Sequence, residues 1–381
     1  MDQVARADLP RSASSPLFER LRHSVGQVTL RAPLQHEATR WHSHAIGGVQ
    51  RRFAQPVTFT PYASVRPCSA RCSFCSENLR KAQGGTPASR LRPASDYFEG
   101  LARALKALRG VPLSWSLSGL ETSDDAGWML QLLATLTAGE RDGPLVEDRV
   151  LYTNGAGFAD AQYGEALRRA LQGFALSWLE LSRHHHEGAV NQNIMRFRPE
   201  VAIGDQAVFE RTARQLADAV ALRLVCILQR GGVAGPQDVA AYLRWAQHCG
   251  AGTVVFREFS RLDDGYRDNA TARYLRAERV SMDALLTACL DDPAVSHGWR
   301  LESLTEGYYF WNLRLRTASG LSVVFESADY GAMHERHASG DVYKLVYFAD
   351  GQLCAGWEPG HDVLLDTRIE PAKHPWLATA G

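Results

Sequence analysis

Short apolar and β-branched runs alternate along this chain with longer stretches that repeat apolar residues at helical spacing. Stretches 95–108, 126–136 and 159–171 place apolar residues every three or four positions, which predicts helices. Pro236 stands where the first turn of a further helix tolerates proline. Six runs predict strands, at residues 57–62, 113–117, 149–153, 175–181, 222–228 and 253–259. Regular alternation of strands and helices predicts an α/β fold with a parallel sheet.

The pattern changes on both sides of this alternating region. Residues 1–54 are rich in Arg, His and Ser and show little periodicity, which predicts an N-terminal extension. After residue 280 a helix is expected at 282–290, followed by strands at 311–317, 321–326 and 342–348 that we expect to be antiparallel. The last of them runs into Asp350-Gly351, a hairpin signal. We therefore expect three parts: the extension 1–54, the βα region 55–280 and a small α+β region 281–381 that packs on it or closes it.

Composition and charge narrow the classes of function. Lys+Arg and Asp+Glu both number 42, so no net charge favours binding to nucleic acid or to an anionic membrane. No stretch approaches the roughly 18 apolar residues of a membrane span, and the N-terminus lacks the apolar run of a signal peptide. We expect a cytoplasmic protein with no membrane and no nucleic-acid partner.

Three of the seven cysteines lie within eight residues, as Cys68-x3-Cys72-x2-Cys75, with Phe74 just before the last. A secreted disulfide framework would be denser and more evenly spread. A [4Fe–4S] cluster held entirely by protein takes four cysteines, so three would leave one iron with an open position, where metal sites do chemistry. A zinc site with a distant fourth ligand, in a non-catalytic binding module, is the alternative.

With this spacing the sequence resembles the radical S-adenosylmethionine (SAM) superfamily. The resemblance implies a partial (β/α)6 barrel with a small C-terminal α+β region, and a [4Fe–4S] cluster on Cys68, Cys72 and Cys75. It also implies that SAM chelates the open iron and is cleaved to a 5′-deoxyadenosyl radical. The layout is closest to the branch containing the GTP 3′,8-cyclase. That enzyme has a second cluster, but the cysteines that remain here are scattered, so we predict one cluster only; they are Cys226, Cys249, Cys289 and Cys354.

Several strand ends match positions at which the superfamily contacts SAM. Ser118-Gly119-Leu120-Glu121 stands where the family commonly has Gly-Gly-Glu holding the SAM amino group, and it departs from that pattern at 118 and 120. Of the consecutive histidines 184–186, we expect one to face the barrel. The resemblance implies the following cofactor-binding residues: Phe74, Gly119, Glu121, Thr153, Ser182, Arg223 and Arg257.

The resemblance further implies an enzyme that abstracts hydrogen from its substrate. Polar residues near the strand ends and in the C-terminal part favour a polar small-molecule substrate, such as a nucleoside, sugar or amino-acid derivative in specialised metabolism. An external electron donor such as flavodoxin or ferredoxin would reduce the cluster. Modification of a ribosomally made peptide is the alternative within the superfamily.

Overall fold

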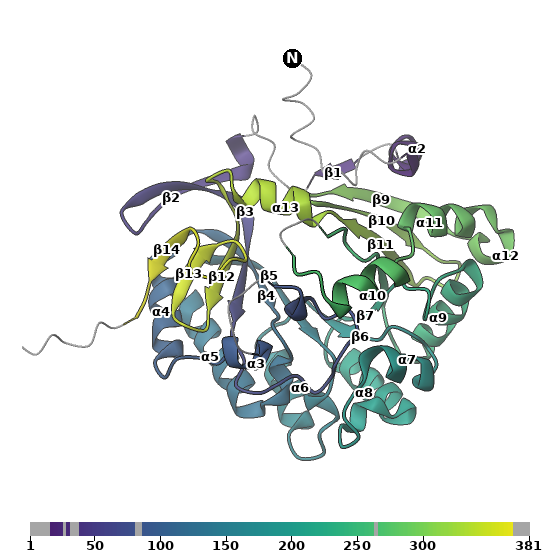
Figure 1. Ribbon diagram of the computed structural model, residues 1–381, viewed down its shortest axis with the longest axis horizontal. Helices are drawn as coiled ribbons and strands as arrows, with labels where there is room; N and C mark the ends of the chain where they lie inside the picture. The colour runs from purple at the N-terminus through teal and green to yellow at the C-terminus, as the bar shows by residue number, and fades with distance from the viewer. Residues whose placement is uncertain (1–15, 26–27, 31–37, 81–85, 263–265, 369–381) are drawn as a thin grey trace, which may run out of the picture.

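The computed structural model describes residues 16–25, 28–30, 38–80, 86–262 and 266–368 (Figure 1). Its strands join into one sheet of 14 strands among the described residues. The strands are β1 (Val28–Leu30), β2 (Trp41–Ile46), β3 (Val49–Tyr62), β4 (Pro112–Leu117), β5 (Leu145–Thr153), β6 (Trp178–Ser182), β7 (Leu222–Ile227), β8 (Thr253–Arg257), β9 (Arg300–Glu306), β10 (Phe310–Arg316), β11 (Ser322–Ala328), β12 (Val342–Phe348), β13 (Gln352–Ala355) and β14 (Val363–Asp366).

Helices follow most strands of the central region. The α-helices are α2 (Pro16–Val25), α3 (Pro87–Arg90), α4 (Tyr97–Ala107), α5 (Ala126–Glu140), α6 (Gly164–Gly173), α7 (Gly188–Met195), α8 (Gln206–Ala219), α9 (Pro236–His248), α10 (Ala270–Glu278), α11 (Met282–Asp291), α12 (Pro293–Ser296) and α13 (Tyr330–His337). Local chemistry marks their starts. The side chains of Asp125 and Asp205 cap α5 and α8 by accepting from backbone N–H groups, and Pro236 opens α9 as expected.

Strands β3 to β8 lie side by side in chain order, and every neighbouring pair among them is parallel. This arrangement confirms the predicted α/β class with a parallel core of six strands. Outward-facing apolar side chains of the core pack against the helices; Phe256 of β8, for example, lies 5.5 Å from the ring of Tyr242 in α9. None of the described helices is both long and apolar enough to cross a membrane.

Two predictions about strands beyond the core need correction. Strands β10 and β11 are antiparallel as expected, but β12 does not join them; it pairs in parallel with β3, on the opposite side of the core. Strand β3 also begins at Val49 rather than 57 and forms a hairpin with β2, inside the segment expected to be an extension. The hairpin signal at Asp350-Gly351 is confirmed, because β12 and β13 pair antiparallel around it. The division into three parts at 54 and 280 stays a prediction.

The path from β11 to β12 requires the sheet to curl. Strand β11 pairs in parallel with β8, so eight parallel strands run from β12 through the core to β11. Seven spacings of about 4.8 Å would separate the outer two by roughly 34 Å in a flat sheet. The connection 329–341 contains α13 and spans at most roughly 29 Å. It must also lead from the end of β11 back to the start of β12, because the two strands run in the same direction. The two edges must therefore approach each other, and α13 lies across the gap between them (Figure 1).

Candidate cluster and cofactor site

Alternation along the core strands gives the sheet one apolar and one polar face. On β7 and β8 the outward residues Leu224, Cys226 and Phe256 are fully buried, whereas Arg223 and Arg257 point to the other face and are half-buried. Successive strand residues point to opposite faces, so the charged positions collect on the inner side of the curled sheet. The inner face carries these charged positions together with a small buried cluster of Val225, Val255 and Val324.

The cysteine loop begins where β3 ends, at the carboxyl edge of the parallel strands. Backbone N–H groups of Arg71 and Ser73 donate to the carbonyls of Met195 and Ile194 at the end of α7, at 2.9 and 3.2 Å. On the other side, the Ser69 N–H donates to the Asp124 carboxylate at 2.6 Å. The loop is thus held on one flank by the end of α7 and on the other by the turn between β4 and α5.

The three predicted cluster ligands are free thiols, and each is partly exposed. Burial raises the pKa of all three; it raises that of Cys72 to about 12, with Cys75 and Glu121 adding to the effect. Backbone N–H groups hydrogen-bond their sulfurs, from Ala70 to Cys68 and from Glu77 and Asn78 to Cys75. Hydrogen bonds donated to a sulfur atom stabilise its thiolate form, and a thiol that binds a metal loses its proton. The donor set therefore fits a thiolate-bound iron–sulfur cluster.

The described residues contain no group of three or more His, Cys, Asp or Glu side chains arranged around a point that a single metal ion would occupy.

Glu121 lies beside the triad at the end of β4 and is 3% exposed. Its Oε1 accepts from the N–H and hydroxyl of Ser123, at 3.1 and 2.7 Å, and from the hydroxyl of Thr153 at 2.6 Å. Its Oε2 accepts from the Asn154 N–H at 2.5 Å. Burial and the Asp124 carboxylate raise the pKa of Glu121 to about 7, and no described cation pairs with it. A buried carboxylate with oriented donors and no cation favours a cationic ligand.

The turn that presents Glu121 is strained. Gly119 has φ +109°, and a Cβ there would lie 2.8 Å from the Tyr62 ring, so the position requires glycine. Leu120 adopts φ +43°, in the left-handed region that costs a non-glycine residue roughly 1–2 kcal/mol. The turn after β4 therefore holds a leucine in a backbone conformation that glycine adopts at lower cost.

Asn154, which directly follows β5, connects the cysteine loop to the Glu121 carboxylate and was not among the predicted site residues. Its Nδ2 donates to the hydroxyl of Ser69 at 2.9 Å and lies 3.6 Å from the sulfur of Cys68, while its backbone N–H binds Glu121. The available signal was its place directly after Thr153, where a core strand ends. Asn154 makes the cysteine loop and the Glu121 carboxylate one hydrogen-bonded unit.

Phe74 packs edge-on against His184, with ring centroids 4.9 Å apart, and against Phe259 at 5.6 Å. His184 is buried, and its Nδ1 accepts from the Ile227 N–H at 3.1 Å. Burial and the neighbouring Arg183 lower the pKa of His184 to about 3, so the ring is neutral and carries its proton on Nε2. The three histidines follow β6 rather than extending it, and the rings of His185 and His186 stack at 4.4 Å.

Two predicted arginines belong to a second polar group on the inner face. Arg257 pairs with Glu180 at 2.9 Å and with Glu326 at 2.7 Å. Arg223 lies with its guanidinium 3.8 Å from the centre of the Trp178 ring. The resemblance implied that Arg257 binds the cofactor, but its partners Glu180 and Glu326 were not identified, because each lies far along the chain from it.

The structure therefore places the predicted residues in two groups. Asn154 links Cys68 to Glu121 and Thr153, and the Gly119 turn presents Glu121 to that group. Phe74 and the half-buried Ser182, which ends β6, lie at the same carboxyl edge of the sheet. Arg223 and Arg257 belong to the inner-face group. The roles of these residues toward a cofactor stay predictions.

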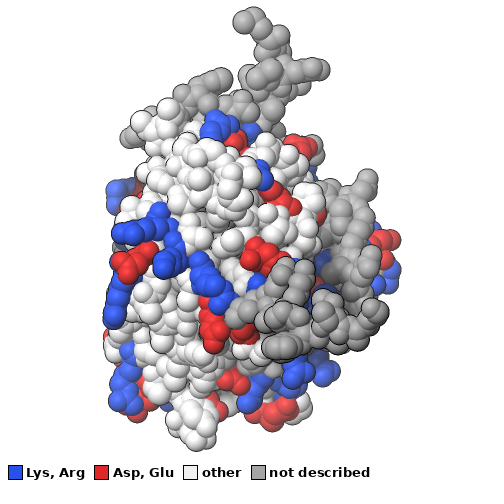
Figure 2. All heavy atoms as spheres, turned by 90° about the vertical axis from the view of Figure 1, so that its left-hand side faces the viewer, with Lys and Arg blue, Asp and Glu red and all other residues white. Residues whose placement is uncertain are grey.

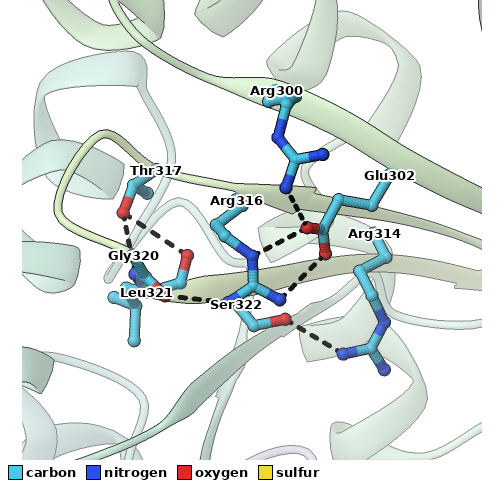
Figure 3. Close-up of polar contacts among 8 residues, drawn as sticks. All are labelled: Arg300, Glu302, Arg314, Arg316, Thr317, Gly320, Leu321 and Ser322. Carbon is cyan, nitrogen blue, oxygen red and sulfur yellow. Dashed lines mark hydrogen bonds and ion pairs between the residues drawn. The ribbon is translucent and has the colours of Figure 1, made fainter.

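Several charged residues elsewhere among the described residues form ion pairs with one another. On the extension of the sheet by β9 and β10, Arg300 and Arg316 both bind Glu302, and Arg314 donates to Ser322 at 3.0 Å (Figure 3). On the face that carries the β2–β3 hairpin, basic side chains lie next to acidic ones and leave large uncharged areas (Figure 2). Strand β3 of this hairpin makes the ion pairs Arg51–Asp362 and Arg52–Asp341.

No family model matches the chain, and no curated protein matches it. Among solved structures it is similar to SuiB of Streptococcus suis bound to S-adenosylmethionine, with 13% identity and a TM-score of 0.47, over 78% of this chain and 60% of SuiB. It is similar to anSMEcpe with bound AdoMet, with 12% identity and a TM-score of 0.41, over 55% and 54%. It is also similar to coproporphyrinogen III oxidase (HemN) from Escherichia coli, a radical SAM enzyme, with 10% identity and a TM-score of 0.42, over 68% and 66%. The chain thus spans about three fifths of the length of SuiB.

Proposed function

We propose that this protein is a radical SAM enzyme whose Cys68, Cys72 and Cys75 hold a [4Fe–4S] cluster. One observation carries the proposal: beside three free thiols, a buried carboxylate with four hydrogen-bond donors has no cationic partner among the described residues. The three thiols would bind the cluster, and the carboxylate would bind the ammonium group of SAM. The Cys-x3-Cys-x2-Cys spacing supports the same conclusion independently.

Each residue has a defined task in this proposal. A bound [4Fe–4S] cluster with SAM supplies a carbon-centred radical able to remove hydrogen from an unactivated carbon. The thiolates of the triad hold the cluster, and the backbone N–H groups on their sulfurs stabilise the negative charge. Glu121 accepts hydrogen bonds from the SAM ammonium, while Ser123, Thr153 and the Asn154 N–H keep its carboxylate in one orientation.

The polar inner face of the sheet supports a polar small molecule as substrate. Arg223, Glu180 and Arg257 lie on this face, and Tyr330, the first residue of α13, interacts electrostatically with Arg257. Enclosure by α13 would keep water away from the reacting carbon. A soluble one-electron donor such as flavodoxin or ferredoxin would reduce the cluster.

The test is anaerobic reconstitution with iron and sulfide, followed by SAM and dithionite, with 5′-deoxyadenosine quantified. The wild type should bind about four irons per chain and form 5′-deoxyadenosine. Cys72→Ala should lose both properties, while Cys249→Ala, which removes a buried thiol remote from the loop, should keep them. Binding of zinc in place of iron would refute the proposal. Turnover only with a ribosomal peptide would replace the small-molecule substrate by a peptide.

A further inference from the structure

The loop that carries the three cysteines forms part of the protein surface. Within it Val65 is 41% exposed, and Arg66 and Arg71 are exposed as well. The C-terminal end of α7 continues this surface, because the Arg71 N–H donates to the Met195 carbonyl and the exposed Arg196 comes next in the chain. The four exposed residues Val65, Arg66, Arg71 and Arg196 are called the loop surface below.

Two arginines of the loop surface, Arg71 and Arg196, have no carboxylate partner among the described residues. Arg66 differs from them, because its Nε lies 2.9 Å from Oδ2 of Asp125. The Arg196 guanidinium donates to the Asn193 carbonyl at 3.4 Å, and this contact brings no negative charge. The whole chain has 42 basic and 42 acidic residues, so the unpaired positive charge is a local property of this surface.

The acids that border the loop surface bind other groups. Asp124 accepts from the Ser69 N–H at 2.6 Å, and Glu200 lies 3.6 Å from Arg198. Glu278 of α10 accepts from a backbone N–H at 2.8 Å. An anionic partner that approaches the loop surface would therefore meet positive charge that no described acid neutralises.

Arg196 keeps its charge beside the cysteines in a strained backbone conformation. It caps the C-terminus of α7 with φ +51°, where glycine or asparagine is usual and where other residues lose roughly 1–2 kcal/mol. Its guanidinium interacts electrostatically with the thiol of Cys72 and with the hydroxyl of Tyr274 on α10. Strain of this kind at a site points to a function for the side chain that it positions.

We infer that the loop surface is the docking site of a small acidic electron-donor protein such as flavodoxin. Arginine is enriched at protein interfaces, and opposite charges speed the encounter of two proteins. Both unpaired arginines are exposed, whereas small ligands bind in concave sites, so a protein surface fits them better than a small anion. Electron transfer slows steeply with distance, so the donor has to dock where the thiols approach the surface.

The electron transfer in this inference rests on the proposed function, whereas the association of the two proteins does not. One electron leaves flavodoxin hydroquinone, which becomes the semiquinone, and the same electron reduces the cluster. No proton or atom is exchanged between the two proteins. Binding and electron transfer can therefore be measured separately.

The first experiment measures binding of oxidised flavodoxin to the reconstituted protein by anaerobic titration calorimetry. Sodium chloride is set to about 50 or about 300 mM, because salt screens exposed charges. At low salt Arg71→Gln and Arg196→Gln should each weaken binding about two- to fivefold, as expected for an exposed ion pair. Arg196→Lys keeps the charge and should bind nearly as the wild type does. Arg109→Gln changes an exposed arginine before β4, at the amino edge of the core strands, and should leave binding unchanged.

The second experiment follows the oxidation of flavodoxin hydroquinone by stopped flow on the same proteins. Arg71→Gln and Arg196→Gln should slow this reaction by the factors seen in binding, and Arg109→Gln should not. Reduced methyl viologen, a small reductant that needs no docking site, should reduce none of the variants more slowly than the wild type. A variant that is slow with both reductants would show damage to the cluster site and would count against the inference.

Equal binding by the wild type and the double variant Arg71→Gln, Arg196→Gln at low salt would overturn the inference. Equally tight binding of parvalbumin, an acidic protein without a redox group, would also overturn it, as would tighter binding of a single-stranded RNA through the same arginines. Iron content and 5′-deoxyadenosine formation with dithionite are measured on the same samples. Arginine-dependent flavodoxin binding without iron would refute the proposed function and keep the docking site. Cluster chemistry with binding that does not depend on the arginines would refute the docking site and keep the proposed function.

Discussion

Glu121→Gln should change how the stability of the metal-free protein depends on pH. The folded-state pKa of Glu121 is about 7, above its ordinary value of 4.5, because the carboxylate is buried beside Asp124. Between these two values the folded state binds more protons than the unfolded state at this residue. The wild type therefore loses stability through Glu121 as pH rises from 4.5 to 7, and the full loss is roughly 3 kcal/mol.

Glu121→Gln removes this pH-dependent loss of stability and introduces a smaller loss of stability that does not change with pH. Glutamine has a single acceptor oxygen, which can take the place of Oε1, and its amide N–H₂ then faces the N–H of Asn154. That unpaired buried donor costs about 1–3 kcal/mol at every pH. The difference in unfolding free energy between variant and wild type should thus shift in favour of the variant by roughly 2 kcal/mol from pH 5.5 to pH 8.

Urea unfolding of both proteins at pH 5.5, 6.5 and 8 measures this shift. Glu99→Gln, at an exposed position on α4, is the matched control and should follow the wild-type curve. Parallel curves for wild type and Glu121→Gln would mean that Glu121 titrates as an ordinary carboxyl, and the account of its environment would then be wrong.

Two further substitutions test the packing around the site. Gly119→Ala forces a Cβ to 2.8 Å from the Tyr62 ring at φ +109°, whereas Gly110→Ala has φ +78° and nothing within 4 Å. Both should lose the roughly 1–2 kcal/mol of left-handed strain, and Gly119→Ala should lose more; equal losses in chemical denaturation would contradict the predicted clash. Arg257→Met leaves two carboxylates without their cation and should cost about 3 kcal/mol at pH 8, and less at pH 5, where they can take up protons. A loss that does not vary with pH would show that the ion pairs contribute little.

The sequence by itself determined the elements and the local chemistry. The period of apolar residues predicted the six core strands in order, and the spacing of Cys68, Cys72 and Cys75 predicted a thiolate site. The residues around Glu121 and Thr153 placed each of them after a predicted strand, where the resemblance implied a contact with SAM. Each of these features depends on residues close together in the chain.

The tertiary structure decided which distant elements became neighbours. Nothing local to β12 specifies that it pairs with β3 instead of β11, because a run of alternating residues suits either partner. In the folded chain α13 connects β11 to β12, and β12 lies beside β3. Likewise the partners of Arg257, at positions 180 and 326, follow from sheet order alone. A charged residue in a strand pattern indicates that a partner is needed, but its identity depends on which strands the folded sheet brings together.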